Sequence, residues 1–168
     1  MQLEIPLEIV ELAAAMAHQG GCRVILNPAP AQPLPDNLYR NISLLTPNES
    51  EAELLSGIKV TDEKSAKEAS KVLLEKGVQA IVITLGAKGA LVVNDKQSEI
   101  ISGYSVKAVD ATAAGDVFNG ALSVALAEGK VLKEAVQFAN AAAALSVTTL
   151  GAQPSAPNRE EILRFMKE

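Results

Sequence analysis

One stretch of the chain combines small residues with a carboxylate: Ala113, Ala114, Gly115 and Asp116. An apolar run that ends at Val109 precedes it, and apolar residues at helical spacing follow over residues 117–126. This order predicts a strand, a tight turn and the start of a helix. The backbone N–H groups of a helix start are unpaired and carry a partial positive charge, which suits a phosphate or a developing oxyanion.

Two interpretations of Asp116 are open at this point. The carboxylate could act on a ligand held at the helix start, since the small residues before it let a ligand approach the backbone closely. It could equally cap the helix, because aspartate is a favoured N-cap residue. The stretch alone slightly favours the cap.

Two further stretches also follow expected strands. Residues 48–51, Asn-Glu-Ser-Glu, come after an apolar run at residues 42–45, and residues 84–89, Thr-Leu-Gly-Ala-Lys-Gly, come after the β-branched run 80–84. The first could be a plain capping box and the second a plain hairpin turn. Ligands in α/β folds bind outside the carboxyl ends of the strands, so three such stretches in this order predict one binding site.

The elements that would position these stretches alternate between strand and helix. Strands are expected at residues 22–26, 42–45, 80–84, 90–93, 99–101 and 106–109, with helices between and after them. This alternation predicts a single layered α/β domain over residues 1–168 with a mainly parallel sheet. Cys22, at the start of an apolar run, is expected in the core. The chain opens on what looks like a strand end leading into a helix, which suggests a fragment.

Composition narrows the function classes. Of 168 residues, 48% are hydrophobic, 21% are charged and 3% are aromatic, so we expect a packed soluble core of aliphatic side chains. The net charge of −5 argues against nucleic-acid binding. No apolar run approaches membrane-spanning length, and one cysteine cannot form an internal disulfide, so a reducing cytoplasm is expected.

Several common motifs are absent. Gly115 and Gly120 have P-loop spacing, but Ala121 and Leu122 stand where that motif needs Lys and Ser or Thr. The Gly86–Gly89 stretch lacks the first glycine of a dinucleotide fingerprint. The sequence contains no G-x-S-x-G, no H-E-x-x-H and no Cys/His cluster, which disfavours hydrolases, metalloproteases and Rossmann dehydrogenases.

The remaining motifs resemble those of the phosphofructokinase-B-type, or ribokinase-like, family of sugar kinases. The resemblance covers essentially the whole chain: residues 2–4 (Gln-Leu-Glu), 27–31 (Asn-Pro-Ala-Pro-Ala), 46–49 (Thr-Pro-Asn-Glu), 83–86 (Ile-Thr-Leu-Gly), 113–116 and 151–153 (Gly-Ala-Gln). It implies a three-layer α/β/α sandwich. The stretches at 2–4 and 27–31 point to the members that phosphorylate D-ribose to ribose 5-phosphate with ATP. Another sugar or nucleoside kinase, or a non-catalytic nucleotide-binding fragment, remains an alternative.

The resemblance implies roles for individual residues. Asp116 would be the base that accepts the proton of the sugar hydroxyl, and backbone N–H groups of Ala113, Ala114 and Gly115 would form the anion hole. Asn48 and Glu51 would hold the Mg²⁺–phosphate assembly through water. The nucleotide loop would comprise Thr84, Leu85, Gly86, Ala87, Lys88 and Gly89, with Asn140 beside the adenine. Glu4 would contact the sugar.

A monovalent cation, K⁺, is also implied. Its site would comprise Asp110, Thr112, Ser146, Thr149, Gly151 and Ser155. The family's N-terminal half, with a β-sheet lid that forms the usual dimer, has no counterpart in this sequence. We therefore expect an open sugar site and exposed apolar surface.

Overall fold

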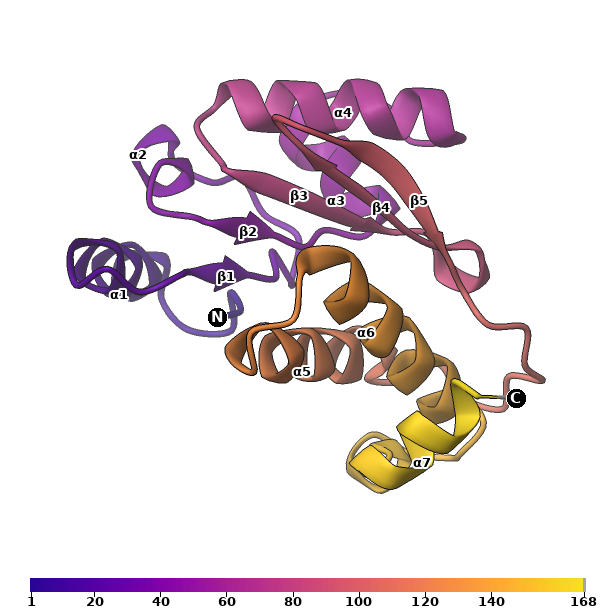
Figure 1. The fold of residues 1–168 in the computed structure, drawn as a ribbon. Coiled ribbons are helices and arrows are strands. Elements are labelled where there is room, and N and C mark those ends of the chain that lie inside the picture. The colour runs from indigo at the N-terminus through magenta and orange to yellow at the C-terminus, as the bar shows by residue number, and fades with distance from the viewer. Residues whose placement is uncertain (168) are drawn as a thin grey trace. The chain divides into compact units, whose positions relative to one another are not determined.

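The computed structural model describes residues 1–167, which form an α/β fold (Figure 1). The strands are β1 (Ile25–Leu26), β2 (Leu44–Leu45), β3 (Ala80–Thr84), β4 (Gly89–Asn94) and β5 (Ser98–Ser102). The helices are α1 (Leu7–Gln19), α2 (Asp36–Tyr39), α3 (Glu49–Ser56), α4 (Glu63–Glu75), α5 (Ala114–Ala127), α6 (Leu132–Ser146) and α7 (Arg159–Phe165). Two short 3-10 turns, η1 (Gly86–Lys88) and η2 (Gln153–Ser155), complete the order. The predicted α/β class is confirmed.

The sheet is mixed, with the strands in the order β1-β2-β3-β4-β5 (Figure 1). β1, β2 and β3 are parallel, with Ile25 opposite Leu44 and Leu44 opposite Ala80. Parallel neighbours need a long crossover, which α2 supplies between β1 and β2, and α3 with α4 between β2 and β3. β3, β4 and β5 follow one another through short turns, so the parallel character predicted from the sequence holds for the first three strands.

The chain divides into two compact units. The first comprises Met1–Leu85 and Leu91–Ile100, and it holds α1 to α4, β1 to β3 and most of β4. Its core is aliphatic, with Leu26, Leu45, Ile81, Ile83 and Leu91 fully buried, as the low aromatic content predicted. The single domain expected over residues 1–168 stays a prediction.

The second unit comprises Gly86–Ala90 and the chain from Ile101 onward, and it holds α5, α6 and α7. α5 and α6 pack against each other, and α6 is rich in buried alanines. Phe118, Leu122 and Ala125 are the buried side chains along the middle of α5. Small side chains let the two helices approach closely. This packing fixes the start of α5, where the candidate catalytic stretch lies.

Two predictions about local structure were wrong. No strand forms at residues 106–109, because the backbone N–H groups of Val109 and Asp110 donate to the carbonyl oxygen of Val147 at 2.7 and 3.1 Å. Cys22 is exposed, because its N–H donates to Ala17 O at 2.9 Å and closes the turn that ends α1. Within residues 1–167, no helix has both the length and the apolar character to cross a membrane.

Candidate functional site

The start of α5 is shaped by an unusual residue. Ala113 is its N-cap and has φ 61° and ψ 9°, the only non-glycine residue with positive φ in the described chain. A side chain in this left-handed region costs about 1–2 kcal/mol, so the surrounding turn must hold it there. Ala114 N–H donates to Ala111 O at 3.2 Å, and Val117 N–H donates to Ala113 O at 2.9 Å. The turn thus brings the chain abruptly into the helix.

One of the three predicted anion-hole donors forms a hydrogen bond within the turn. Ala114 N–H has the carbonyl oxygen of Ala111 as its acceptor. In the part of the chain that the structure describes, the N–H groups of Ala113 and Gly115 have no backbone acceptor. A Cβ added at Gly115 would meet no atom within 4 Å, so the absent side chain leaves open space rather than allowing close packing. Two backbone donors therefore remain for an anion at this helix start.

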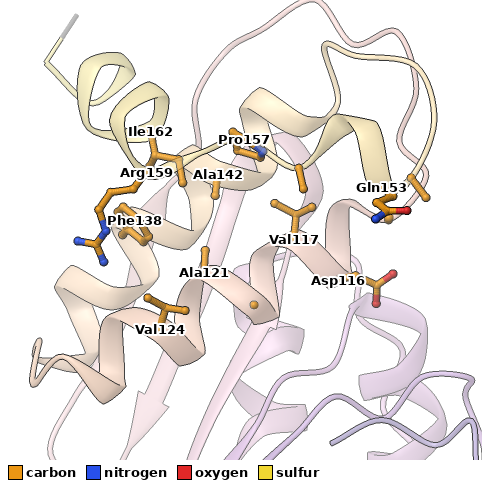
Figure 2. A pocket seen from close by; sticks show the side chains of 14 residues that line it. Asp116, Val117, Ala121, Val124, Phe138, Ala142, Gln153, Pro157, Arg159 and Ile162 are labelled. Carbon is orange, nitrogen blue, oxygen red and sulfur yellow. The ribbon is translucent and has the colours of Figure 1, made fainter.

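Asp116 follows at the edge of an open cavity in the second unit. The cavity has a volume of about 500 Å³ and is lined by α5, α6, α7 and the η2 turn. Figure 2 shows Asp116 and Gln153 at one end and Arg159 with Phe138 at the other. Arg159 forms an ion pair with Glu128, so its charge is already neutralised there. Asp116 is the carboxylate lining this cavity.

The segment before α5 is tied to the loop after α6. The Asp110 carboxylate accepts from Thr112 N–H through Oδ1 and from Gly151 N–H through Oδ2, both at 2.9 Å. Hydrogen bonds from Thr112 and then from Gly151 hold the pKa of Asp110 below its usual range. Thr149 N–H donates to Ser146 O at 3.1 Å in the same loop. The structure therefore joins Asp110 directly to Thr112 and Gly151, three members of the predicted cation site.

The donor set of this region suits a hard cation. The buried hydroxyls of Ser146 and Ser155 donate their protons to Ala143 O and Ala152 O, at 2.9 and 2.7 Å, which leaves oxygen lone pairs available. Carboxylate, hydroxyl and carbonyl oxygens are the ligands such ions prefer. No cluster of three or more His, Cys, Asp or Glu residues capable of holding a metal occurs within residues 1–167. Any cation here would rely on the single carboxylate of Asp110 together with hydroxyl and backbone oxygens.

Two predicted phosphate-side elements adjoin in the first unit. Asn48 forms an isolated parallel bridge with Thr84, and Thr84 N–H donates to Pro47 O at 3.0 Å. They meet because β2 and β3 are parallel neighbours, so both segments leave the sheet at the same edge. The capping box is confirmed: Asn48 Oδ1 accepts from Glu51 N–H at 2.9 Å, and Glu51 Oε2 accepts from Asn48 N–H at 2.8 Å. Capping and ligand binding are compatible here, since Asn48 itself is exposed.

The carboxylate of Glu51 is buried, which disfavours its ionised form. Its side chain is buried, with 6% of the residue exposed. Burial raises the pKa of Glu51, and the hydrogen bond from the Asn48 backbone only partly opposes this. A buried carboxylate that lacks a cation partner destabilises the fold when it is ionised.

Replacing Glu51 with glutamine should therefore stabilise the chain in a pH-dependent way. Folding raises the pKa of Glu51 above its unfolded-state pKa of about 4.5. The stability that protonated Glu51 contributes is therefore present below pH 4.5 and is lost as the pH rises through the pKa of the folded state. Glutamine does not titrate and can still accept from Asn48 N–H. The advantage of Glu51→Gln in free energy of unfolding should grow as the pH rises from 4.5, as measured by urea denaturation without divalent metal. The control is Glu53→Gln, at an exposed residue of the same helix. If the advantage of Glu51→Gln stays constant or shrinks as the pH rises, folding does not raise the pKa of Glu51.

The loop at Gly86–Gly89 depends on two glycines for its shape. Gly86 and Gly89 have φ of 56° and 101°. A Cβ at Gly89 would overlap the carbonyl oxygen of Ile101 and the nitrogen of Gly103. Gly103 N–H donates to Lys88 O at 3.2 Å, and a Cβ at Gly103 would lie 2.6 Å from Ala87 O. Sequence reasoning missed Gly103, although a glycine directly after a strand can indicate close backbone approach.

The last two predicted site residues are Asn140 and Glu4. Asn140, within α6, is buried, and its side-chain amide donates to the backbone carbonyl oxygens of Ile101 and Ser102. Glu4 is exposed directly after Leu3, whose N–H donates to Ala29 O at 2.8 Å beside β1. Glu4, Asn48, Glu51, Thr84 and Leu85 lie in the first unit. The other predicted site residues lie in the second.

The chain is similar in sequence to known carbohydrate kinases. The family described as pfkB family carbohydrate kinase matches residues 1–159. The chain is 53% identical over 167 residues to a ribokinase of Haemophilus influenzae, covering 99% of this chain and 55% of that protein. It is 44% identical to a ribokinase of Staphylococcus aureus, covering 96% of this chain and 53% of that protein. The chain thus spans about half the length of the curated relatives it matches.

The chain is also similar to solved ribokinase structures. A Thermotoga maritima ribokinase superposes with a TM-score of 0.91 at 46% identity, and an Arabidopsis thaliana ribokinase complexed with ribose and ATP does so with a TM-score of 0.95 at 34% identity. Each match covers 99% of this chain and 55% of the other. The predicted ribokinase-like α/β fold is confirmed.

Proposed function

Because the chain belongs to the pfkB family of carbohydrate kinases, we propose that it carries the nucleotide-binding and catalytic part of an ATP-dependent ribose kinase. The observation that carries the proposal is the start of α5, where Asp116 follows a turn in which two N–H groups have no backbone acceptor among the described residues. The relatives named ribokinase, and the related structure holding ribose and ATP, support the choice of substrates.

The proposed reaction transfers the γ-phosphoryl group of ATP to the 5-hydroxyl of D-ribose. Asp116 accepts the hydroxyl proton as the sugar oxygen forms its bond to the γ-phosphorus. The bond from that phosphorus to the bridging oxygen breaks, and ADP leaves. Since such transition states are loose, positioning and charge stabilisation matter more than base strength. The N–H groups of Ala113 and Gly115 would stabilise charge on the transferring group.

Two ions belong to this proposal. Asn48 and Glu51 would hold Mg²⁺ through water, and the ion would neutralise charge on the phosphates. The oxygen-rich loop around Asp110, Ser146 and Ser155 would hold K⁺, with Thr112, Thr149 and Gly151 beside it. Because Asp110 already joins the segment before α5 to the loop after α6, an ion there would stiffen the turn that presents the anion hole.

The experiment that tests the proposal uses the chain and a chimera. Titration calorimetry of the chain with Mg-ATP should show binding. A chimera in which residues 1–168 replace the matching part of the Haemophilus influenzae ribokinase should form ADP in a D-ribose-dependent manner. Binding by the chain with no turnover in the chimera would instead favour a non-catalytic nucleotide-binding module. Faster turnover with another sugar or a nucleoside would move the assignment to a sibling kinase.

A further inference from the structure

The least expected contact in the second unit involves a polar residue in the middle of an apolar helix. Asn140 lies in α6 among buried alanines, and only 6% of its surface is exposed. Its Nδ2 donates to Ile101 O at 3.1 Å and to Ser102 O at 3.2 Å. A buried amide is destabilising unless it is hydrogen-bonded, so this pair of contacts accounts for its presence.

The orientation of this amide follows from its acceptors. Both partners are carbonyl oxygens, which only the NH₂ side can satisfy, and that group has two donors. A flipped amide would set Oδ1 against two other oxygens. Nδ2 therefore faces the backbone of residues 101–102.

The backbone of residues 101–103 also contacts the loop at Gly86–Gly89. Ile101 O, which accepts from Asn140, is also the atom that a side chain at Gly89 would overlap. One residue further on, Gly103 N–H donates to Lys88 O at 3.2 Å. Segment 101–103 therefore contacts both Asn140 and the loop. A shift of this segment must move the loop, because Gly89 leaves no space between them.

We infer that Asn140 is a positioning residue that holds the Gly86–Gly89 loop in place through the backbone of residues 101–103. The loop's exposed residues, Gly86, Ala87 and Lys88, are then presented to a nucleotide phosphate in one conformation. This inference rests on the proposed function for its consequence, which is tighter nucleotide binding. The positioning of the loop by Asn140 is inferred only from the contacts among residues 86–89, residues 101–103 and Asn140.

The test replaces the donors while keeping the shape. Asn140→Asp sets a carboxylate oxygen where Nδ2 was, and Asn140→Ala removes the donors without adding charge. Gln137→Glu, the same amide-to-acid change on a half-buried residue of α6, is the matched control. Circular dichroism confirms that each variant is folded at the temperature used.

Hydrogen exchange of the chain then measures the link directly. Amides in residues 86–89 and 101–103 should exchange about tenfold faster in both Asn140 variants, because both hydrogen bonds from Asn140 to residues 101 and 102 are lost. Amides of α5 should be unchanged, and Gln137→Glu should match the unaltered chain. Unchanged exchange in the loop, or an equal rise throughout α5, would overturn the inference.

Calorimetry with Mg-ATP separates the inference from the proposed function. The Kd of the Asn140 variants should rise about tenfold. Faster loop exchange with an unchanged Kd would overturn the role in nucleotide binding. If the unaltered chain binds no Mg-ATP, the proposed function fails, and loop exchange alone decides whether Asn140 positions the loop.

Discussion

Asp116→Ala should lower the D-ribose-dependent turnover of the chimera by about 10³-fold or more, because a positioned base contributes 10²–10⁴-fold and acts together with the anion hole beside it. The KM for ATP should change little, since no contact to the nucleotide is assigned to this carboxylate. Asp116 lines the open cavity at the start of α5, so its truncation should leave the helix packing of Phe118 and Leu122 intact.

The measurement is initial-rate ADP formation at saturating ATP and ribose. Asp116→Asn keeps the shape but cannot accept the proton, and it should lose a similar factor. Asp95→Ala, which removes an exposed carboxylate in the turn before β5, is the control and should retain full turnover. Turnover of Asp116→Ala within threefold of the unaltered chimera would show that Asp116 is not the catalytic base.

Gly89→Ala should be the most destabilising single change that this structure identifies. The new Cβ would overlap Ile101 O and Gly103 N, and φ at this position is 101°. Overpacking costs about 1–3 kcal/mol and a strained backbone about 1–3 kcal/mol more, so we expect a loss of about 2–6 kcal/mol in free energy of unfolding. Both obstacles are backbone atoms, which cannot rotate away as a side chain would.

Urea denaturation of the chain measures this loss. Gly86→Ala is the matched control, because Gly86 lies in the same loop with φ of 56°, and an added Cβ meets no atom within 4 Å. It should lose only about 1–2 kcal/mol, from backbone strain alone. Equal losses in the two variants would show that residues 101–103 do not pack against the loop as described.

Features determined over three or four residues could be predicted from the sequence. The capping box at Asn48 with Glu51 forms as expected, because it closes across one helical turn. The strand at Ala80–Thr84 also forms where its β-branched run predicts it. Residue types and spacing also placed Asp116 beside a helix start, where its chemistry is determined locally.

Predictions that needed a partner elsewhere in the chain were less secure. The apolar residues 106–109 have strand-like composition, but a strand forms only if a neighbouring strand pairs with it, and Val109 instead donates to Val147 O. Cys22 begins an apolar run, yet its N–H is used to end α1. Composition cannot distinguish these outcomes, because the competing hydrogen-bond acceptor belongs to another element.

The sequence by itself determined most of the elements, their order and the types of residue at the candidate site. Only the tertiary structure decided what these residues touch: Asn140 reaches acceptors 39 and 38 residues away, and Asp110 a donor 41 residues away. It also placed Gly89 against Ile101 and Asn48 beside Thr84. The physical reason is that such contacts depend on how helices and strands pack, and no local pattern specifies which distant backbone group will meet a side chain.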